Sequence, residues 1–215
     1  MRRQDNELWG GILMDKERLK RQIDFIVEID QLKRIMRRSR IIGDTKDDTL
    51  WENSAEHSWH IAMLAMVLSD YADEMVDAVK VMKMALVHDI VEIDAGDTFA
   101  YDQAGNLDKA EREGKAASRI FGLLPDDQRD EMMELWREFE EGKTNEAQFA
   151  AALDFLQPLL QNYYTEGYSW KLNKVTADRV LARNEAATHN SQAIKEFIDW
   201  LLHDAIEKGY LPDKY

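Results

Sequence analysis

Residues 85–97 read ALVHDIVEIDAGD, and this stretch joins an apolar run to a dense cluster of ionisable groups. The apolar run leads directly into His88 and Asp89, and three more acids follow within eight positions: Glu92, Asp94 and Asp97. A buried segment excludes charge unless the charge is paired or bound to a ligand. The cluster therefore indicates that these side chains bind something.

Helical periodicity dominates the chain on both sides of this stretch. The 215 residues include only three prolines and ten glycines, and no run of alternating β-branched residues is evident. Apolar residues at helical spacing predict helices at about 15–38, from Asn53 onward, and at about 75–91, 108–121, 125–141, 144–165, 176–187 and 189–208. Asn53 with Glu56 three positions later has the form of a capping box. The pattern predicts one all-α domain over residues 1–215.

The first predicted helix carries two apolar stripes. The stripes comprise Leu19, Ile23, Ile26 and Val27, and Phe25, Ile29, Leu32 and Met36. Continued past Val27, the face of the first stripe reaches Arg34 and Arg37. We therefore expect Arg37 to lie on a helix and to be able to point inward.

Composition limits the classes of function. The net charge of -14 opposes general binding to nucleic acid or to anionic membranes, although a few arginines or a metal ion can invert the field in one pocket. The basic segment LKRIMRRSR is more typical of a solvated helix end. Without cysteine the chain has no disulfide or thiolate chemistry. No apolar segment suggests a secretory signal or a membrane span, so we expect a cytoplasmic protein.

Two of the five histidines occupy inward faces of predicted helices. His57 shares its face with Ile61 and Leu64, and His88 lies three residues after Ala85. Either residue alone is more often a satisfied core histidine. Asp89 favours a functional interpretation, because no basic residue nearby in sequence neutralises it.

A further carboxylate, Asp154, interrupts the apolar segment AALDFLQPLL. It is either a solvent-facing acid on an apolar helix or a fourth ligand. Two imidazoles and two carboxylates would suit a divalent ion such as Mn, Co, Fe, Ni or Zn.

Taken in order, AEHSWHIAMLAMVL, ALVHDIVEIDAGD and AALDFLQPLLQNY resemble the H…HD…D signature of the HD-domain metal-dependent phosphohydrolases. They are most similar to the branch of bacterial 5'-deoxynucleotidases and the related human HD-domain protein. The resemblance covers about residues 19–170, which we expect to form the core of a compact HD-type helical bundle. C-terminal helices at about 176–208 would complete it.

The resemblance assigns a role to each candidate residue. It implies one divalent metal ion, Mg included among the possibilities, bound by four ligands: His57, His88, Asp89 and Asp154. It makes Glu92 and Asp97 the catalytic acids, with Glu92 positioning or activating the attacking water. It makes Arg37 and Glu138 contact the substrate. We expect His60 to be a packing residue or to lie in the layer behind the ligands, and His189 and His203 to be structural or exposed.

Two departures from the family pattern concern substrate selectivity. The deoxynucleotidases carry a tryptophan directly after the phosphate-contacting arginine, whereas this chain has Arg38 there. The connection that includes SRIIGDTKDDTLW is also longer. Both features lie where selectivity for the sugar and base would be set.

The expected activity is hydrolysis of a (deoxy)nucleoside 5'-monophosphate by metal-activated water attack. Two alternatives are a non-catalytic nucleotide or metal sensor and a hydrolase of a different phosphate ester. The complete acid set argues against a sensor. The resemblance also implies a homodimer, with no nucleic-acid or membrane partner.

Overall fold

The computed structural model describes residues 8–9, 12–13, 16–43, 50–102, 104–187 and 190–213. It confirms the all-α class, because the strands in this part of the chain form only two short antiparallel pairs. The helices are α1 (Lys16–Ile29), α2 (Ser54–Leu68), α3 (Ala78–Val87), α4 (Glu92–Ala95), α5 (Lys109–Phe121), α6 (Asp126–Glu141), α7 (Asn145–Tyr164), α8 (Tyr168–Leu172), α9 (Ala177–Ala187) and α10 (Gln192–Glu207). Short 3-10 helices are η1 (Asp30–Arg34), η2 (Ser69–Tyr71) and η3 (His88–Val91). His189 lies outside the described residues.

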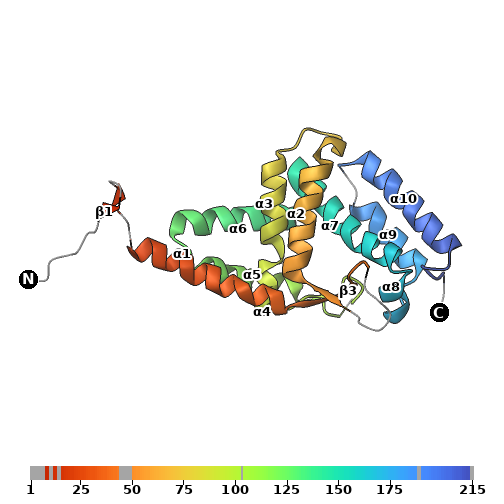
Figure 1. Cartoon of the computed structure of the whole chain (residues 1–215), viewed down its shortest axis with the longest axis horizontal. Helices are drawn as coiled ribbons and strands as arrows, with labels where there is room; N and C mark the ends of the chain where they lie inside the picture. The colour runs from red at the N-terminus through yellow and green to blue at the C-terminus, as the bar shows by residue number, and fades with distance from the viewer. Residues whose placement is uncertain are drawn as a thin grey trace, which may run out of the picture.

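Helix α7 is the central element of the fold. It lies between the α2 and α3 pair on one side and α9 and α10 on the other (Figure 1). Its buried side chains point in several directions, and Phe149, Leu153 and Phe155 are at most 2% exposed. A helix that is apolar on most of its circumference must be covered on most sides. The site residue Asp154 is therefore held on a helix that its neighbours cover on most sides.

The prediction of one helix over residues 15–38 was wrong. Helix α1 ends at Ile29, and after η1 the chain becomes strand β3 (Met36–Arg40). This strand pairs antiparallel with β4 (Trp51–Asn53). The pairing is a contact between segments distant in sequence, which a local apolar period cannot reveal. Arg37 consequently lies on a strand beside the start of α2.

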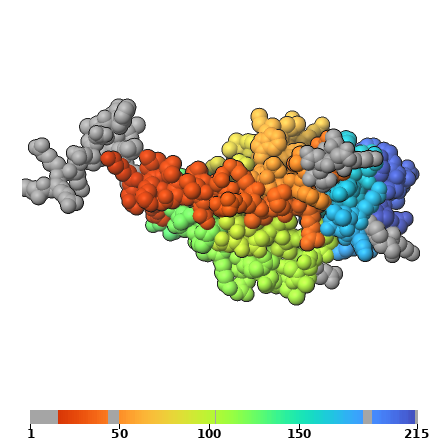
Figure 2. All heavy atoms as spheres, turned by 60° about the horizontal axis from the view of Figure 1, so that its bottom comes forward, coloured from red at the N-terminus to blue at the C-terminus, as the bar shows by residue number. Residues whose placement is uncertain are grey.

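The expectation for the first apolar stripe also needs correction. Its four residues are between 42% and 64% exposed, in the order Leu19, Ile23, Ile26, Val27. In the opposite stripe, Phe25 on α1 and Leu32 on η1 are buried, whereas Met36 is 52% exposed. Figure 2 shows α1 lying along the outside of the molecule, where one of its faces has no cover.

The helix predicted over residues 75–91 is divided. Asp77 caps α3 by accepting from the backbone N–H groups of Val79 and Lys80, and α3 ends at Val87. A 3-10 turn and the short α4 follow. Gly96 then has a positive φ of 76°, a conformation that glycine adopts without strain, and it turns the chain toward Asp97.

Two short strands, β1 (Leu8–Trp9) and β2 (Ile12–Leu13), form a separate hairpin before α1. Among the helices that the structure describes, none is long and apolar enough to cross a membrane.

Candidate metal centre

The position of His57 follows from the way α2 begins. The Asn53 side chain accepts from the backbone N–H of Glu56, and the Glu56 carboxylate accepts from the backbone N–H of Asn53, both at 3.0 Å. This capping box, expected from the sequence, is confirmed. It fixes the first turn of α2 and directs His57 into the core, where the residue is 0% exposed.

The two ring nitrogens of His57 have different partners. Nδ1 lies 2.9 Å from Oε1 of Gln157, whose Nε2 donates to a carboxylate oxygen of Glu52 at 2.7 Å. Because an amide oxygen only accepts, Nδ1 carries the hydrogen, and the neutral ring has its lone pair on Nε2. That Nε2 faces Oδ1 of Asp154 at 2.9 Å. Two acceptors this close require a proton or a cation between them.

His88 is oriented in the same manner. Its Nδ1 donates to the backbone carbonyl of Ala85 at 2.8 Å, so the lone pair of the neutral ring is again on Nε2. This buried Nε2 has no hydrogen-bond partner. It lies 3.1 Å from Oδ1 of Asp89 and 3.9 Å from Oδ1 of Asp154. A buried polar atom left in this state indicates an absent ligand.

The donor groups of His57, His88 and Asp154 all lie within 4.8 Å of one another. Asp89 adjoins them, with Oδ2 3.8 Å from Nε2 of His57. Both rings use Nδ1 to bind the protein and turn Nε2 toward carboxylates, which is the usual arrangement of histidines that ligate a metal. The residues therefore fit a divalent cation, and the structure brings the four predicted ligands together.

The predicted acids and Arg37 surround this centre. Arg37 donates from Nη1 to Asp89 at 3.0 Å, and the same nitrogen is 3.9 Å from Asp97. Ser54 donates to Oε2 of Glu92 at 2.6 Å, and Glu92 is buried. The structure therefore places Glu92, Asp97 and Arg37 together with the four predicted ligands.

Burial and neighbouring charge perturb the acids. Burial, followed by the charges of Asp89 and Asp97, raises the pKa of Glu92 to about 9. Burial likewise raises the pKa of Asp97, against the opposing effect of the Arg37 guanidinium. Four carboxylates close together, two with raised pKa values, indicate that positive charge is missing from this space.

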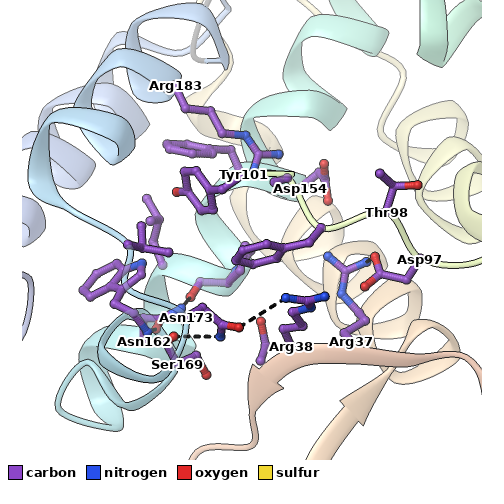
Figure 3. Close-up of a pocket in the computed structure, with 18 of the residues that line it drawn as sticks. Arg37, Arg38, Asp97, Thr98, Tyr101, Asp154, Asn162, Ser169, Asn173 and Arg183 are labelled. Carbon is purple, nitrogen blue, oxygen red and sulfur yellow. Dashed lines mark hydrogen bonds and ion pairs between the residues drawn. The ribbon is translucent and has the colours of Figure 1, made fainter. Parts of the chain in front are cut away.

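The acids open into a pocket that extends toward the C-terminal helices (Figure 3). The far wall is contributed by α8 and the segment after it, including Ser169, Trp170 and Asn173. The loop after Gly96 contributes Phe99 and Tyr101. The segment GYSWKLNKV, residues 167–175, carries no recognisable catalytic motif, and it forms much of this wall.

Glu138 is the predicted site residue that the structure places elsewhere. Its Oε1 accepts from Lys80 Nζ at 2.7 Å and from Thr144 Oγ1 at 2.6 Å. It lines a separate surface hollow with Lys80 and Leu135 rather than the pocket of Asp89 and Asp154. The reason is that Glu138 and Thr144 lie at the two sides of the α6–α7 connection, where they bond to each other.

Sequence reasoning missed the polar layer behind His57. Glu52 is 2% exposed, accepts from Gln157 and Gln161, and lies 3.6 Å from Arg37 Nε. Burial raises the pKa of Glu52, although His57, Arg37 and the two amides oppose that effect. A signal was present: Gln157 and Gln161 follow Asp154 at three and seven positions, on the same face of an apolar helix.

The remaining histidines differ in setting. His60 is half-buried, has Nδ1 3.1 Å from the Gln157 amide nitrogen, and has a pKa lowered by burial. His203 is exposed and lies 3.2 Å from Glu207 one turn along α10. Neither belongs to the cluster.

This geometry is that of an HD-type metal centre, and comparison with known proteins agrees. The HD domain family matches residues 29–207, so the chain belongs to the HD domain family. The family expected from the sequence is thereby confirmed.

The relatives of this chain include proteins named 5'-deoxynucleotidase and metal-dependent phosphohydrolase. Residues of this chain are 32% identical to 5'-deoxynucleotidase HDDC2 of Homo sapiens over 139 residues, covering 65% of each chain. The same protein of Danio rerio is 32% identical, with 67% of this chain and 69% of that protein covered. The matched segments thus span about two thirds of these curated relatives. A crystal structure of a predicted metal-dependent phosphohydrolase from Magnetospirillum magnetotacticum MS-1 is 48% identical, with a TM-score of 0.84 over 92% of this chain and 100% of that one.

Proposed function

We propose that the chain is a metal-dependent phosphomonoesterase that acts on nucleoside 5'-monophosphates, deoxynucleotides included. One observation carries this proposal: two buried imidazoles turn their Nε2 atoms toward Asp89 and Asp154, directly beside the guanidinium of Arg37. The names of the relatives, 5'-deoxynucleotidase and metal-dependent phosphohydrolase, support the same reaction and substrate class.

Four residues would hold one divalent ion: His57, His88, Asp89 and Asp154. Nitrogen and oxygen donors in equal number suit Mn, Co, Fe, Ni or Zn, and Mg is also compatible with the carboxylates. Such an ion would act as a Lewis acid toward a phosphate oxygen and would lower the pKa of water. Elemental analysis of the purified protein identifies the ion.

Three residues around the ion would bind the phosphate and transfer protons. Glu92 accepts the Ser54 hydroxyl at Oε2, which leaves Oε1 to take the proton from the attacking water. A cation bound by Asp89 would lower the pKa of Glu92, which burial and the charges of Asp89 and Asp97 raise, and would so favour the carboxylate that this role needs. Arg37 would bind the phosphoryl oxygens, since its planar guanidinium matches them. As the P–O5' bond breaks, Asp97 would supply a proton to the departing alkoxide. We do not assign Glu138 to this substrate site, because its contacts lie in the α6–α7 connection.

The test is release of inorganic phosphate from a panel of ribo- and deoxyribonucleoside 5'-monophosphates, with Mn or Co added. The variant Glu92→Gln should lower kcat by at least about 100-fold, because general-base catalysis contributes roughly 100- to 10,000-fold. Its metal content should match that of the wild type. Turnover retained in Glu92→Gln would contradict the base role. An absence of phosphate release from every nucleotide would contradict the function itself.

We also propose that the chain forms a homodimer and functions in the cytoplasm as a single domain. Support for the dimer comes from the outer face of α2, where Trp59, Met63 and Met66 are 60%, 39% and 63% exposed at helical spacing. The uncovered stripe of α1 is a second exposed apolar face, and exposed apolar patches are typical of interaction surfaces. A second copy of the chain would cover this face of α2.

A further inference from the structure

Four basic side chains line the pocket of the metal centre: Arg37, Arg38, Lys109 and Arg183. Two of them have acidic partners, since Arg37 bonds to Asp89 and Lys109 lies 3.5 Å from Glu113. Arg38 and Arg183 form no ion pair with a carboxylate in the part of the chain that the structure describes. In a chain of net charge -14, two guanidiniums in one pocket that are not in ion-pair contact with a carboxylate are unexpected.

Arg38 extends from β3 along one wall of the pocket. Its Cζ lies 4.6 Å from the centroid of the Phe99 ring, and its Nη1 donates weakly to the Asn173 side chain at 3.4 Å. A guanidinium stacked on a ring keeps its N–H donors at its edge. Most of these donors remain available to a ligand.

Arg183 reaches the pocket from α9, on the opposite wall (Figure 3). Its Cζ lies 5.4 Å from the Phe155 ring centroid and 6.0 Å from that of Tyr101. Phe99 and Tyr101 belong to one loop and contact each other edge to face, with centroids 5.4 Å apart. The two arginines therefore flank a common aromatic loop. Arg38 stacks on Phe99, and its charge acts on Asp97 from beyond ion-pair distance. Arg183 forms a hydrogen bond with the Tyr101 side chain.

Resting on the proposed function, we propose that the preferred substrate is a nucleotide that carries a second phosphate group. Arg37 serves the phosphate that is hydrolysed, and Arg38 and Arg183 bind the one that remains. Water attacks the first phosphorus and becomes part of the released inorganic phosphate. In a 3',5'-bisphosphate the 5'-ester bond breaks, and the leaving 5'-alcohol takes up a proton and keeps its 3'-phosphate. In a 5'-diphosphate the P–O–P bond breaks, and the leaving group is the nucleoside 5'-monophosphate. The second group is either on the ribose, as in a nucleoside 3',5'-bisphosphate, or in the chain of a 5'-diphosphate.

The experiment compares AMP, adenosine 3',5'-bisphosphate and ADP. Phosphate release by the Mn-loaded wild type gives kcat/KM for each nucleotide, and calorimetry on Mn-loaded Glu92→Gln protein gives each Kd without relying on turnover. Each measurement is repeated with Arg38→Gln and with Arg183→Gln. Glutamine keeps much of the side chain that packs on the rings but removes the charge. The matched control is Arg129→Gln, because Arg129 is exposed on α6 and pairs with Asp126 and Asp130.

We expect one of the two doubly phosphorylated nucleotides to bind at least about tenfold more tightly than AMP, since hydrogen bonds between charged groups are the stronger class. The nucleotide that does so identifies the position of the second phosphate. Either glutamine variant should lower this preference several-fold, and Arg129→Gln should preserve it.

The inference would be overturned if both doubly phosphorylated nucleotides bound within twofold of the affinity for AMP. It would also be overturned if neither of them bound. A preference that survives both substitutions would overturn it too. The proposed function fails separately, when the wild type releases no phosphate although the calorimetric preference is present.

Discussion

At the residue scale, the site depends on which nitrogen of each histidine carries a hydrogen. Gln157 sets this for His57, because its own amide is anchored to Glu52. The Ala85 carbonyl does the same for His88. In both histidines the hydrogen is on Nδ1, which bonds to the protein. The lone pair of Nε2 is therefore available to a cation.

Replacing Gln157 by leucine should therefore weaken metal binding while leaving all four ligands in place. Partners that orient a ligating histidine typically contribute roughly 10- to 100-fold in affinity, and we expect a loss in that range. Competition with a chromogenic chelator measures it. Gln192→Leu is the control, since Gln192 is exposed and its side chain bonds to Glu196 on the same helix. Equal metal affinity in the two variants would show that Gln157 does not orient His57.

Glu113 on α5 offers a prediction about pH. It is 4% exposed, and burial raises its pKa from 4.5 to about 6, although Lys109 opposes the shift. Because the folded state binds the proton more tightly, Glu113 stabilises the fold fully below pH 4.5. That contribution, about 2 kcal/mol for a shift of this size, is lost as pH rises through 6.

The variant Glu113→Gln should remove this part of the pH dependence. Urea unfolding between about pH 4 and pH 7 compares its slope of stability against pH with that of the wild type. Glu111→Gln on the same helix alters an exposed carboxylate paired with Lys115 and serves as the control. An unchanged slope in Glu113→Gln would contradict the assignment.

At the scale of elements, strand β3 decides where the phosphate-binding guanidinium lies. The apolar period of α1 continues to Met36, which is why a helix to residue 38 was expected. The structure ends that helix early, because pairing with β4 satisfies the backbone of both segments. The same pairing joins Arg37 to the cap of α2, and so to His57.

The capping box of α2 should contribute both stability and metal affinity. Asn53→Ala is expected to cost about 1 kcal/mol in the free energy of unfolding, the usual value of an N-cap. It should also weaken metal binding, because His57 lies in the first turn of that helix. Thr144 caps α7 in the corresponding way, because its hydroxyl oxygen accepts from the backbone N–H of Ala147. Thr144→Ala should therefore lower stability and leave metal affinity unchanged. Chemical denaturation and metal titration of both variants separate the two effects.

At the scale of the whole molecule, the apolar outer face of α2 leads us to predict a homodimer. Met66→Glu would place a charge at the centre of the proposed dimer interface and should convert the protein to a monomer. Light scattering coupled to size-exclusion chromatography measures the mass. Met75→Glu is the matched control, because Met75 is 95% exposed and precedes α3. A monomeric wild type, or a dimeric Met66→Glu variant, would contradict the homodimer.

The sequence by itself determined the helical class, the capping box of α2 and the residues that meet at the metal centre. The helical class and the cap are readable because they depend on short spacings, and His88 lies beside Asp89 in the chain. The resemblance to the HD family was needed to join His57 and Asp154 to that pair. Family likeness also allowed Arg37 to be selected, although its helical setting was wrong.

Only the tertiary structure decided the surroundings of that centre. Strand β3, the buried Glu52 with its two glutamines, the displaced Glu138 and the wall made by α8 all depend on contacts between distant segments. Arg183 is separated from Arg38 by most of the chain, yet both line one pocket. A local pattern records which side chains share a face of one element, whereas packing decides which faces meet.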